Sequence, residues 1–93
     1  MIDKKKFYIN GQWVSPKNPK EIQVIDPATE KNCAVISLAG AEDVNAAVTA
    51  AKKAFETWEF TSKEERVKLL EDLYVLYKKR WADIAEAITL EMG

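Results

Sequence analysis

The hydrophobic pattern of the chain changes its period at Gly40, and this change divides the sequence into two unlike parts. Before Gly40, short aromatic and β-branched runs alternate with turn residues, as is typical of β-strands. After Gly40, apolar residues recur at the 3.6-residue spacing of amphipathic helices. The pattern predicts an α+β fold class, with two β-hairpins in residues 1–39 followed by two to three helices in residues 40–93.

Both hairpins are predicted from their turn residues. Residues 7–9 and 13–14 are joined through Asn10 and Gly11, which tolerate the positive φ angles of a type I′ turn. Residues 22–25 and 34–38 form a second pair of strands, and between them Pro27 presets φ while Asp26 can cap the bend. Isolated two-stranded ribbons are marginal in water, so other elements must cover them.

The first helix is predicted to begin with Gly40 or Ala41 near its N-cap. Glu42 and Asp43 follow, where negative charge interacts favourably with the helix dipole and the free amides. The predicted apolar face of this helix consists of Val44, Ala47, Val48, Ala51, Phe55 and Trp58.

A second helix is predicted to begin at Ser62, because Ser62 and Glu65 have the spacing of a capping box. Its apolar residues recur at helical spacing, and its charged residues, Arg66 among them, are assigned to the remaining faces. A third helix is predicted after a bend at residues 81–83, which would make it collinear with the second or kinked against it. The apolar residues of the two helices are Val67, Leu70, Leu73, Tyr74, Tyr77 and Trp81, then Ile84, Ala85, Ile88 and Met92.

Charge and composition nominate no partner. The 14 basic and 15 acidic residues nearly cancel, so we expect no binding to nucleic acid or to membranes, and three lysines at positions 4–6 are interpreted as a solvated arm. No apolar run approaches the roughly 20 residues that span a bilayer. Cys33, the single cysteine, cannot form an internal disulfide, which favours a cytoplasmic protein, and the absence of histidine removes the commonest metal ligand and acid-base group.

Candidate catalytic groups are few. Cys33 stands in a predicted strand without a neighbouring base, so a packed or edge-strand thiol is the favoured interpretation. Gly40 is a single glycine between strand and helix, which does not make a phosphate-binding loop. Acidic residues alternate with basic ones on the helices, and we interpret the helix aromatics as core. The acidic set is Glu64, Glu65, Glu71, Asp72, Glu86 and Glu91. The aromatic set is Trp58, Tyr74, Tyr77 and Trp81.

A family resemblance rests on ordered motifs along the whole chain. Residues 7–14 (FYINGQWV), 24–30 (VIDPATE) and 42–48 (EDVNAAV) resemble the amino-terminal region of NAD(P)-dependent aldehyde dehydrogenases. Arg66 with Leu70, and the ending Glu91-Met92-Gly93, resemble the helices and the segment that follow in that family. The resemblance implies roughly the first fifth of a longer protein, as an incomplete part of its cofactor-binding domain.

The resemblance also implies an activity that lies outside these residues. Members of the family oxidise an aldehyde to a carboxylic acid through attack of a cysteine thiolate, with hydride transfer to NAD or NADP. The motifs of the nucleophile, the glutamate base and the dinucleotide-binding turn all follow the region matched here, and Cys33 is not in the nucleophile's motif. We therefore expect no catalytic or cofactor-binding residue in the chain, and no turnover by it alone. Its expected partners are the remainder of the polypeptide and, in the parent, further copies in a dimer or tetramer.

One minor site is implied in part. Many members of the family bind a structural monovalent cation through a main-chain oxygen before the Asx-Pro turn and a carboxylate before the glycine, positions that Ile25 and Glu91 occupy here. Glutamate stands where aspartate is common, which lengthens the reach by one methylene.

Two alternatives to a fragment remain open: a stand-alone, non-catalytic interaction module and a truncated gene product. Apolar residues at the end of the chain, among them Trp81, Ile88 and Met92, favour the fragment, because a module that functions alone would present fewer of them. The aldehyde substrate is not determined by these residues.

Overall fold

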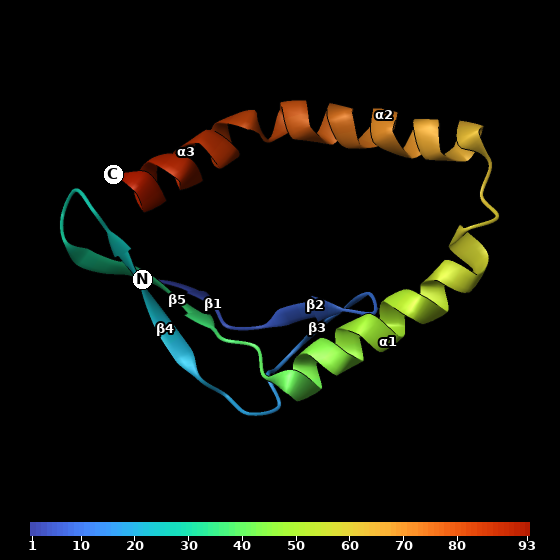
Figure 1. Cartoon of the computed structure of the whole chain (residues 1–93). Coiled ribbons are helices and arrows are strands. Elements are labelled where there is room, and N and C mark those ends of the chain that lie inside the picture. Colours follow the sequence, from blue (N-terminus) through green and yellow to red (C-terminus); the bar gives the residue numbers. More distant parts are fainter.

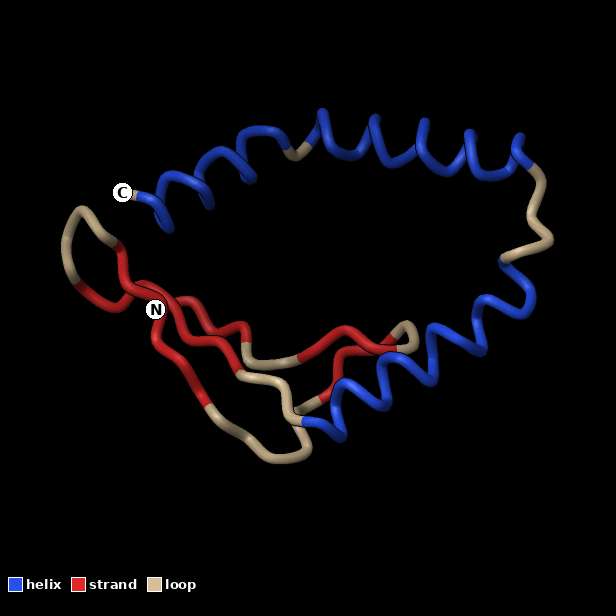
Figure 2. The backbone as a smooth tube through the Cα atoms, in the orientation of Figure 1, coloured by secondary structure: helices blue, strands red, loops and turns tan.

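The computed structural model describes all residues from Met1 to Gly93. Five strands precede three helices, which confirms the order expected from the change of period at Gly40. The strands are β1 (Ile2–Lys4), β2 (Phe7–Ile9), β3 (Gln12–Val14), β4 (Glu21–Asp26) and β5 (Lys31–Ser37), and the helices are α1 (Ala41–Trp58), α2 (Lys63–Lys79) and α3 (Trp81–Met92). The strands form a three-stranded sheet in the order β1-β5-β4 and a separate β2-β3 hairpin (Figure 2).

The β2-β3 hairpin is confirmed with the predicted turn. Asn10 and Gly11 have φ angles of 53° and 75°, the left-handed values that a type I′ turn requires at both central positions. The register pairs Tyr8 with Trp13, and their rings lie 5.1 Å apart between centroids. This aromatic pair on one face adds to the stability of the ribbon.

The second hairpin is confirmed, with longer strands than the sequence predicts. β4 and β5 are antiparallel, and the register shifts between Val24 and Ile25. Asp26 caps the bend as expected, since its carboxylate accepts a hydrogen bond of 2.9 Å from the Ala28 amide. The turn closes when the Glu30 amide donates to the Asp26 carbonyl at 2.8 Å, with Glu30 at a φ of 58°.

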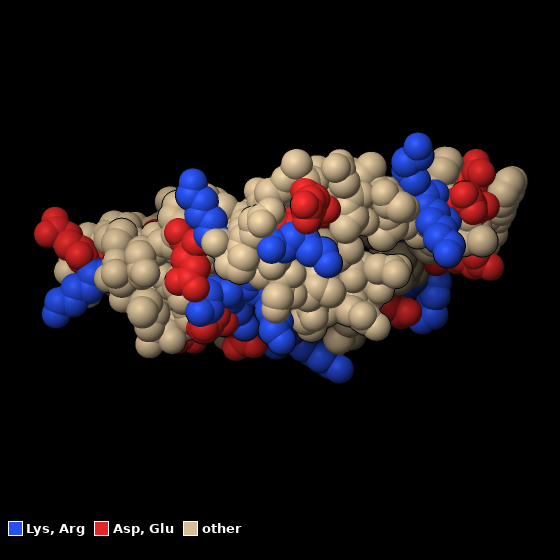
Figure 3. All heavy atoms as spheres, turned by 90° about the horizontal axis from the view of Figure 1, so that it is seen from below, with Lys and Arg blue, Asp and Glu red and all other residues tan.

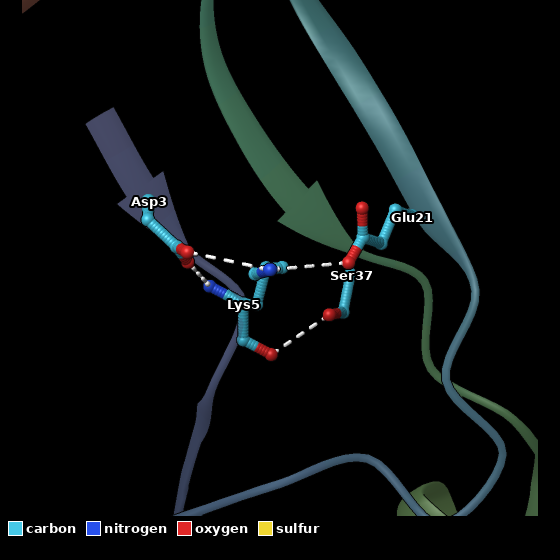
Figure 4. A network of polar contacts seen from close by, with 4 residues as sticks. All are labelled: Asp3, Lys5, Glu21 and Ser37. Atoms are coloured by element: carbon cyan, nitrogen blue, oxygen red, sulfur yellow. Dashed lines mark hydrogen bonds and ion pairs between the residues drawn. The ribbon is translucent and has the colours of Figure 1, made fainter. Parts of the chain in front are cut away.

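The lysines at positions 4–6, interpreted as a solvated arm, are exposed or half-buried, but the first of them belongs to a strand, because residues 2–4 form β1. This strand pairs in parallel with β5, and Lys5 follows it. The Lys5 ammonium lies 3.3 Å from Asp3 and 3.2 Å from Glu21, while the Ser37 hydroxyl donates to the Lys5 carbonyl at 2.8 Å (Figure 4). Hydrogen bonding to Glu21, then to Asp3, raises the pKa of Lys5. The arm is thus exposed but ordered.

Helix boundaries agree with the predicted caps. Gly40 is the N-cap of α1, and Ser62 is the N-cap of α2, where its hydroxyl accepts the Glu65 amide at 3.1 Å. The bend between α2 and α3 lies at Arg80, whose φ and ψ of −104° and 13° leave the helical region. The bend therefore lies one residue before residues 81–83, the position predicted from the sequence.

The three helices form an open arc instead of a packed layer (Figure 1). α1 begins beside the β2-β3 hairpin, α2 lies away from the strands, and α3 returns toward β4 and β5. The radius of gyration is 17.1 Å, whereas a compact domain of this length has about 12 Å. The exposed surface is 8022 Å², against about 5,500 Å² for a folded monomer of this mass.

Only Val35 and Asp43 are buried. The side chains predicted as core, Trp58, Tyr74, Tyr77 and Trp81, are between 45% and 61% exposed, so that prediction is wrong for residues 1–93 taken alone. The rings of Tyr77 and Trp81, four residues apart in the sequence, contact each other with 5.5 Å between their centroids. The amphipathic faces exist as predicted, but no element of this chain covers them.

Candidate functional site

A groove of about 370 Å³ lies between α3 and the three-stranded sheet. Side chains of all three strands and of α3 line it, so the groove lies between the strand part and the helical part of the chain. Apolar residues form most of the wall, and four charged residues join them: Lys4, Asp83, Glu86 and Glu91. Glu91, one of the two predicted cation ligands, is therefore part of this groove.

The other predicted ligand, Ile25, lies on β4 directly after the register shift. The turn that follows it meets the end of α3: a Cβ atom at Gly93 would lie 3.3 Å from the Cβ of Pro27 and 3.4 Å from the Ala28 nitrogen. Gly93 has a φ of 87°, so both its conformation and its close approach to Pro27 favour glycine. The fold thus brings the segment of Glu91 to the turn after Ile25.

The Ile25 carbonyl and the Glu91 carboxylate are the kind of ligand that a hard cation prefers, but two ligands do not complete its coordination shell. A main-chain carbonyl and a carboxylate are oxygen donors, which alkali and alkaline-earth cations prefer. The chain has no group of three or more histidine, cysteine or acidic side chains that could hold a metal ion. Ile25 and Glu91 could therefore supply only part of a coordination shell.

Cys33 also lines the groove, from the central strand β5. Its thiol donates a hydrogen bond of 3.4 Å to the Val24 carbonyl, and the side chain is half-buried. The predicted packed thiol is consistent with this placement, whereas an edge-strand position is not. The contact is structural, with the thiol hydrogen directed at a main-chain oxygen.

The acidic residues of α2 and α3 form no cluster that could hold a metal ion, although Asp83, Glu86 and Glu91 of α3 line the same groove. Asp72 is bound at 2.7 Å by Lys68, four residues earlier on the same exposed face of α2. This ion pair raises the pKa of Lys68, chiefly through the hydrogen bond to Asp72. Solvated pairs of this kind are the arrangement that the sequence indicates for these carboxylates.

Asp43 has a structural role that the sequence reveals only in part. Its position in the first turn of α1 predicts an interaction with the helix dipole and the free amides, and one carboxylate oxygen does accept the Gly40 amide at 3.0 Å. The other oxygen accepts the Lys17 amide, also at 3.0 Å, from the loop after β3. This second bond spans 26 residues, and no local pattern signals it.

The start of α1 does not fit a dinucleotide phosphate. Its first turn carries Glu42 and Asp43, and the buried Asp43 carboxylate occupies the position beside the Gly40 amide. A phosphate there would meet like charge, and the Gly40 amide is already bonded to Asp43. The interpretation of Gly40 as a junction glycine is consistent with this geometry.

Comparison with protein families decides the identity of the fold. The model of the aldehyde dehydrogenase family matches residues 13–93. The chain belongs to the aldehyde dehydrogenase family. The predicted resemblance is thereby confirmed, as is the prediction of an α+β segment of the aldehyde dehydrogenase fold.

Relatives and solved structures of the family agree over the whole chain. A 3-succinoylsemialdehyde-pyridine dehydrogenase of a Pseudomonas species is 50% identical over 93 residues, which are all of this chain and 20% of that protein. The crystal structure of an aldehyde dehydrogenase from Bartonella henselae matches with a TM-score of 0.98 at 50% identity, over 100% of this chain and 20% of the other.

A third match is a mutant of aldehyde dehydrogenase C from Pseudomonas syringae, solved with NAD+ and octanal. Its TM-score is 0.93 at 43% identity, and the match covers 96% of this chain and 18% of that structure. The chain thus spans about a fifth of the length of these aldehyde dehydrogenases.

Proposed function

We propose that residues 1–93 are the amino-terminal part of an enzyme that oxidises an aldehyde to a carboxylic acid with NAD or NADP. In this proposal the segment is structural and belongs to the cofactor-binding domain, with hairpins in residues 1–39 and helices in residues 40–93. The catalytic residues lie in the remainder of the polypeptide.

The observation that carries the proposal is the match to the Bartonella aldehyde dehydrogenase. The open arc of residues 1–93 superposes on that structure with a TM-score of 0.98, although it amounts to 20% of that chain. Because only two residues are buried, contacts within the segment contribute little to the stability of this open arrangement. Its agreement with a segment of a whole enzyme supports a role as part of such an enzyme.

NAD is the cofactor that the comparisons favour. The Pseudomonas syringae relative was solved with NAD+, and NAD or NADP supplies the hydride acceptor of the proposed oxidation. The negative charge of the Asp43 carboxylate disfavours a phosphate at the start of α1, so we assign the cofactor to residues outside this segment.

The proposal extends to assembly, location and partners. The resemblance implies that the complete protein forms a dimer or tetramer. The single cysteine favours the cytoplasm, and the nearly balanced charge speaks against nucleic acid or a membrane as a partner. Small groups of basic and acidic side chains are interspersed on the face seen in Figure 3. No helix of the structure combines the length and apolar character needed to cross a bilayer.

Ile25 and Glu91 are proposed as two ligands of a structural monovalent cation in the complete protein. The close approach of Gly93 to Pro27 supports this, because the end of α3 lies at the turn that follows Ile25. The remaining oxygen ligands are assigned to the rest of the polypeptide and to water.

The test of the proposed activity is aldehyde-dependent reduction of NAD+ or NADP+ by the complete protein. A panel of aliphatic aldehydes, aromatic aldehydes and semialdehydes is assayed by the absorbance of the reduced cofactor. We expect turnover by the complete protein and none by residues 1–93 alone. A complete protein without activity on the whole panel, or turnover by the 93-residue chain, would contradict the proposal.

A further inference from the structure

Arg66 lies within the apolar face of α2. In an α-helix, residues three, four and seven positions apart share a face, and from Arg66 these positions are Leu69, Leu70 and Leu73. The assignment of Arg66 to a polar face of α2 is therefore wrong. The opposite face holds Lys68, Asp72 and Lys79, which the Lys68 to Asp72 ion pair marks as a solvated surface.

Arg66 has no acidic partner in the chain, unlike Lys68 and Arg80. Lys68 is paired with Asp72 at 2.7 Å, and Arg80 lies 3.8 Å from Asp83. Arg66 is exposed and forms no salt bridge in the chain. A guanidinium presents five donors in a rigid fork, which two carboxylate oxygens match well.

The face around Arg66 is wide and uncovered. Leu69, Leu70 and Leu73 are between 53% and 64% exposed. The chain exposes about 2,500 Å² more than a folded monomer of its mass, which is comparable with the area buried at obligate interfaces, about 2,000–5,000 Å². Since the Bartonella structure contains this same open arc within a chain five times as long, the length needed to cover the face is present in such proteins.

We infer that the remainder of the same polypeptide packs on the apolar face of α2 and presents an aspartate or glutamate carboxylate to Arg66. Burial of an unpaired guanidinium is strongly unfavourable, so whatever covers Leu69, Leu70 and Leu73 must also neutralise Arg66. This inference rests on the proposed function, because it takes the occupant from the complete enzyme. Arg66 is a positioning residue in it, with no contact to substrate or cofactor.

The direct test is the rate of phenylglyoxal modification of Arg66 in the complete wild-type protein, followed by peptide mass spectrometry. The urea-unfolded protein is the reference for a fully accessible arginine. We expect modification at least about tenfold slower in the native protein, since buried guanidinium groups are shielded from solvent. Equal rates in the two states would overturn the inference. Protection that disappears when the oligomer is diluted to monomers would also overturn it, by placing a second subunit on this face.

Variants separate the ion pair from simple burial. Arg66→Met leaves the proposed carboxylate buried without a partner, whereas Lys79→Met removes a cation of similar length from the solvated face of the same helix. We expect Arg66→Met to shorten the half-life of thermal inactivation by at least about tenfold relative to Lys79→Met, with Arg66→Lys in between. Equal half-lives of Arg66→Met and Lys79→Met would overturn the inference.

Aldehyde oxidation by the wild-type preparation is measured alongside, so that the two proposals fail separately. An active enzyme with a freely reactive Arg66 contradicts only the inference about α2. A protein that is inactive on every aldehyde contradicts the proposed function, and its labelling pattern still decides whether Arg66 is covered.

Discussion

Asp43 accepts the main-chain amide of Lys17 at 3.0 Å, and this bond joins the loop after the first hairpin to the beginning of α1. The second oxygen of the same carboxylate accepts the Gly40 amide at 3.0 Å. Asp43 is 4% exposed, the lowest fraction among the charged residues. One side chain thus fixes the junction where the chain changes from strands to helices.

Replacement of Asp43 by alanine is expected to destabilise the complete protein. Two part-buried amides lose their acceptor, which costs about 2–6 kcal/mol in total at the usual cost per unsatisfied group. Urea unfolding measures the loss. Glu42→Ala is the matched control, because Glu42 is exposed in the same first turn of α1, and it should cost less than about 1 kcal/mol. Similar losses in both variants would argue against the role of the Lys17 bond.

The Ser62 cap of α2 gives a second prediction. Ser62→Ala removes the acceptor of the Glu65 amide and should cost about 1 kcal/mol, whereas Ser62→Asp keeps a capping oxygen and should cost little. Urea unfolding midpoints of the two variants make the comparison. If the alanine and aspartate variants lose equal stability, packing and not the cap determines the start of α2.

The cation ligands are tested through ion-dependent stability. Glu91→Gln replaces a carboxylate by a neutral amide, which binds a hard cation more weakly. The wild-type complete protein should inactivate more slowly in sodium or potassium chloride than in N-methylglucamine chloride of equal ionic strength, and Glu91→Gln should lose this difference. Glu86→Gln, five residues earlier in the same groove, serves as the control. A wild-type protein whose inactivation rate is the same with all three cations would contradict the proposed site.

Residues 1–93 alone are expected to be marginally stable or self-associated. Two buried residues cannot offset the conformational entropy of a chain of this length, and the uncovered apolar faces favour association. Sedimentation velocity and binding of a hydrophobic dye measure both properties. A compact monomer that binds no dye and unfolds cooperatively would contradict this expectation.

The local features of the fold could be predicted from the sequence, since short stretches determine them. The Asn10-Gly11 turn, the Gly40 start of α1 and the Ser62 cap each depend on residues within one turn of each other, and the structure confirms all three. The two hairpins follow from the same local chemistry.

Long-range features could not be predicted in the same way. The parallel pairing of β1 with β5 joins residues more than 30 positions apart, and the Asp43 bond to Lys17 joins residues 26 positions apart. The aromatic residues Tyr74, Tyr77 and Trp81 have a core-like pattern, but the pattern does not say what covers them, and within this chain they are exposed. The candidate cation site stays a prediction, because Ile25 and Glu91 supply only part of the coordination shell that it would need.

The central claim is that residues 1–93 are part of a longer aldehyde dehydrogenase, and the intact mass of the native polypeptide tests it most directly. Because the chain of 10.6 kDa corresponds to 20% of its relatives, the account predicts a native mass about five times as large, with these residues at its amino terminus. A native polypeptide of 10.6 kDa would contradict the claim and favour a stand-alone module or a truncated gene product.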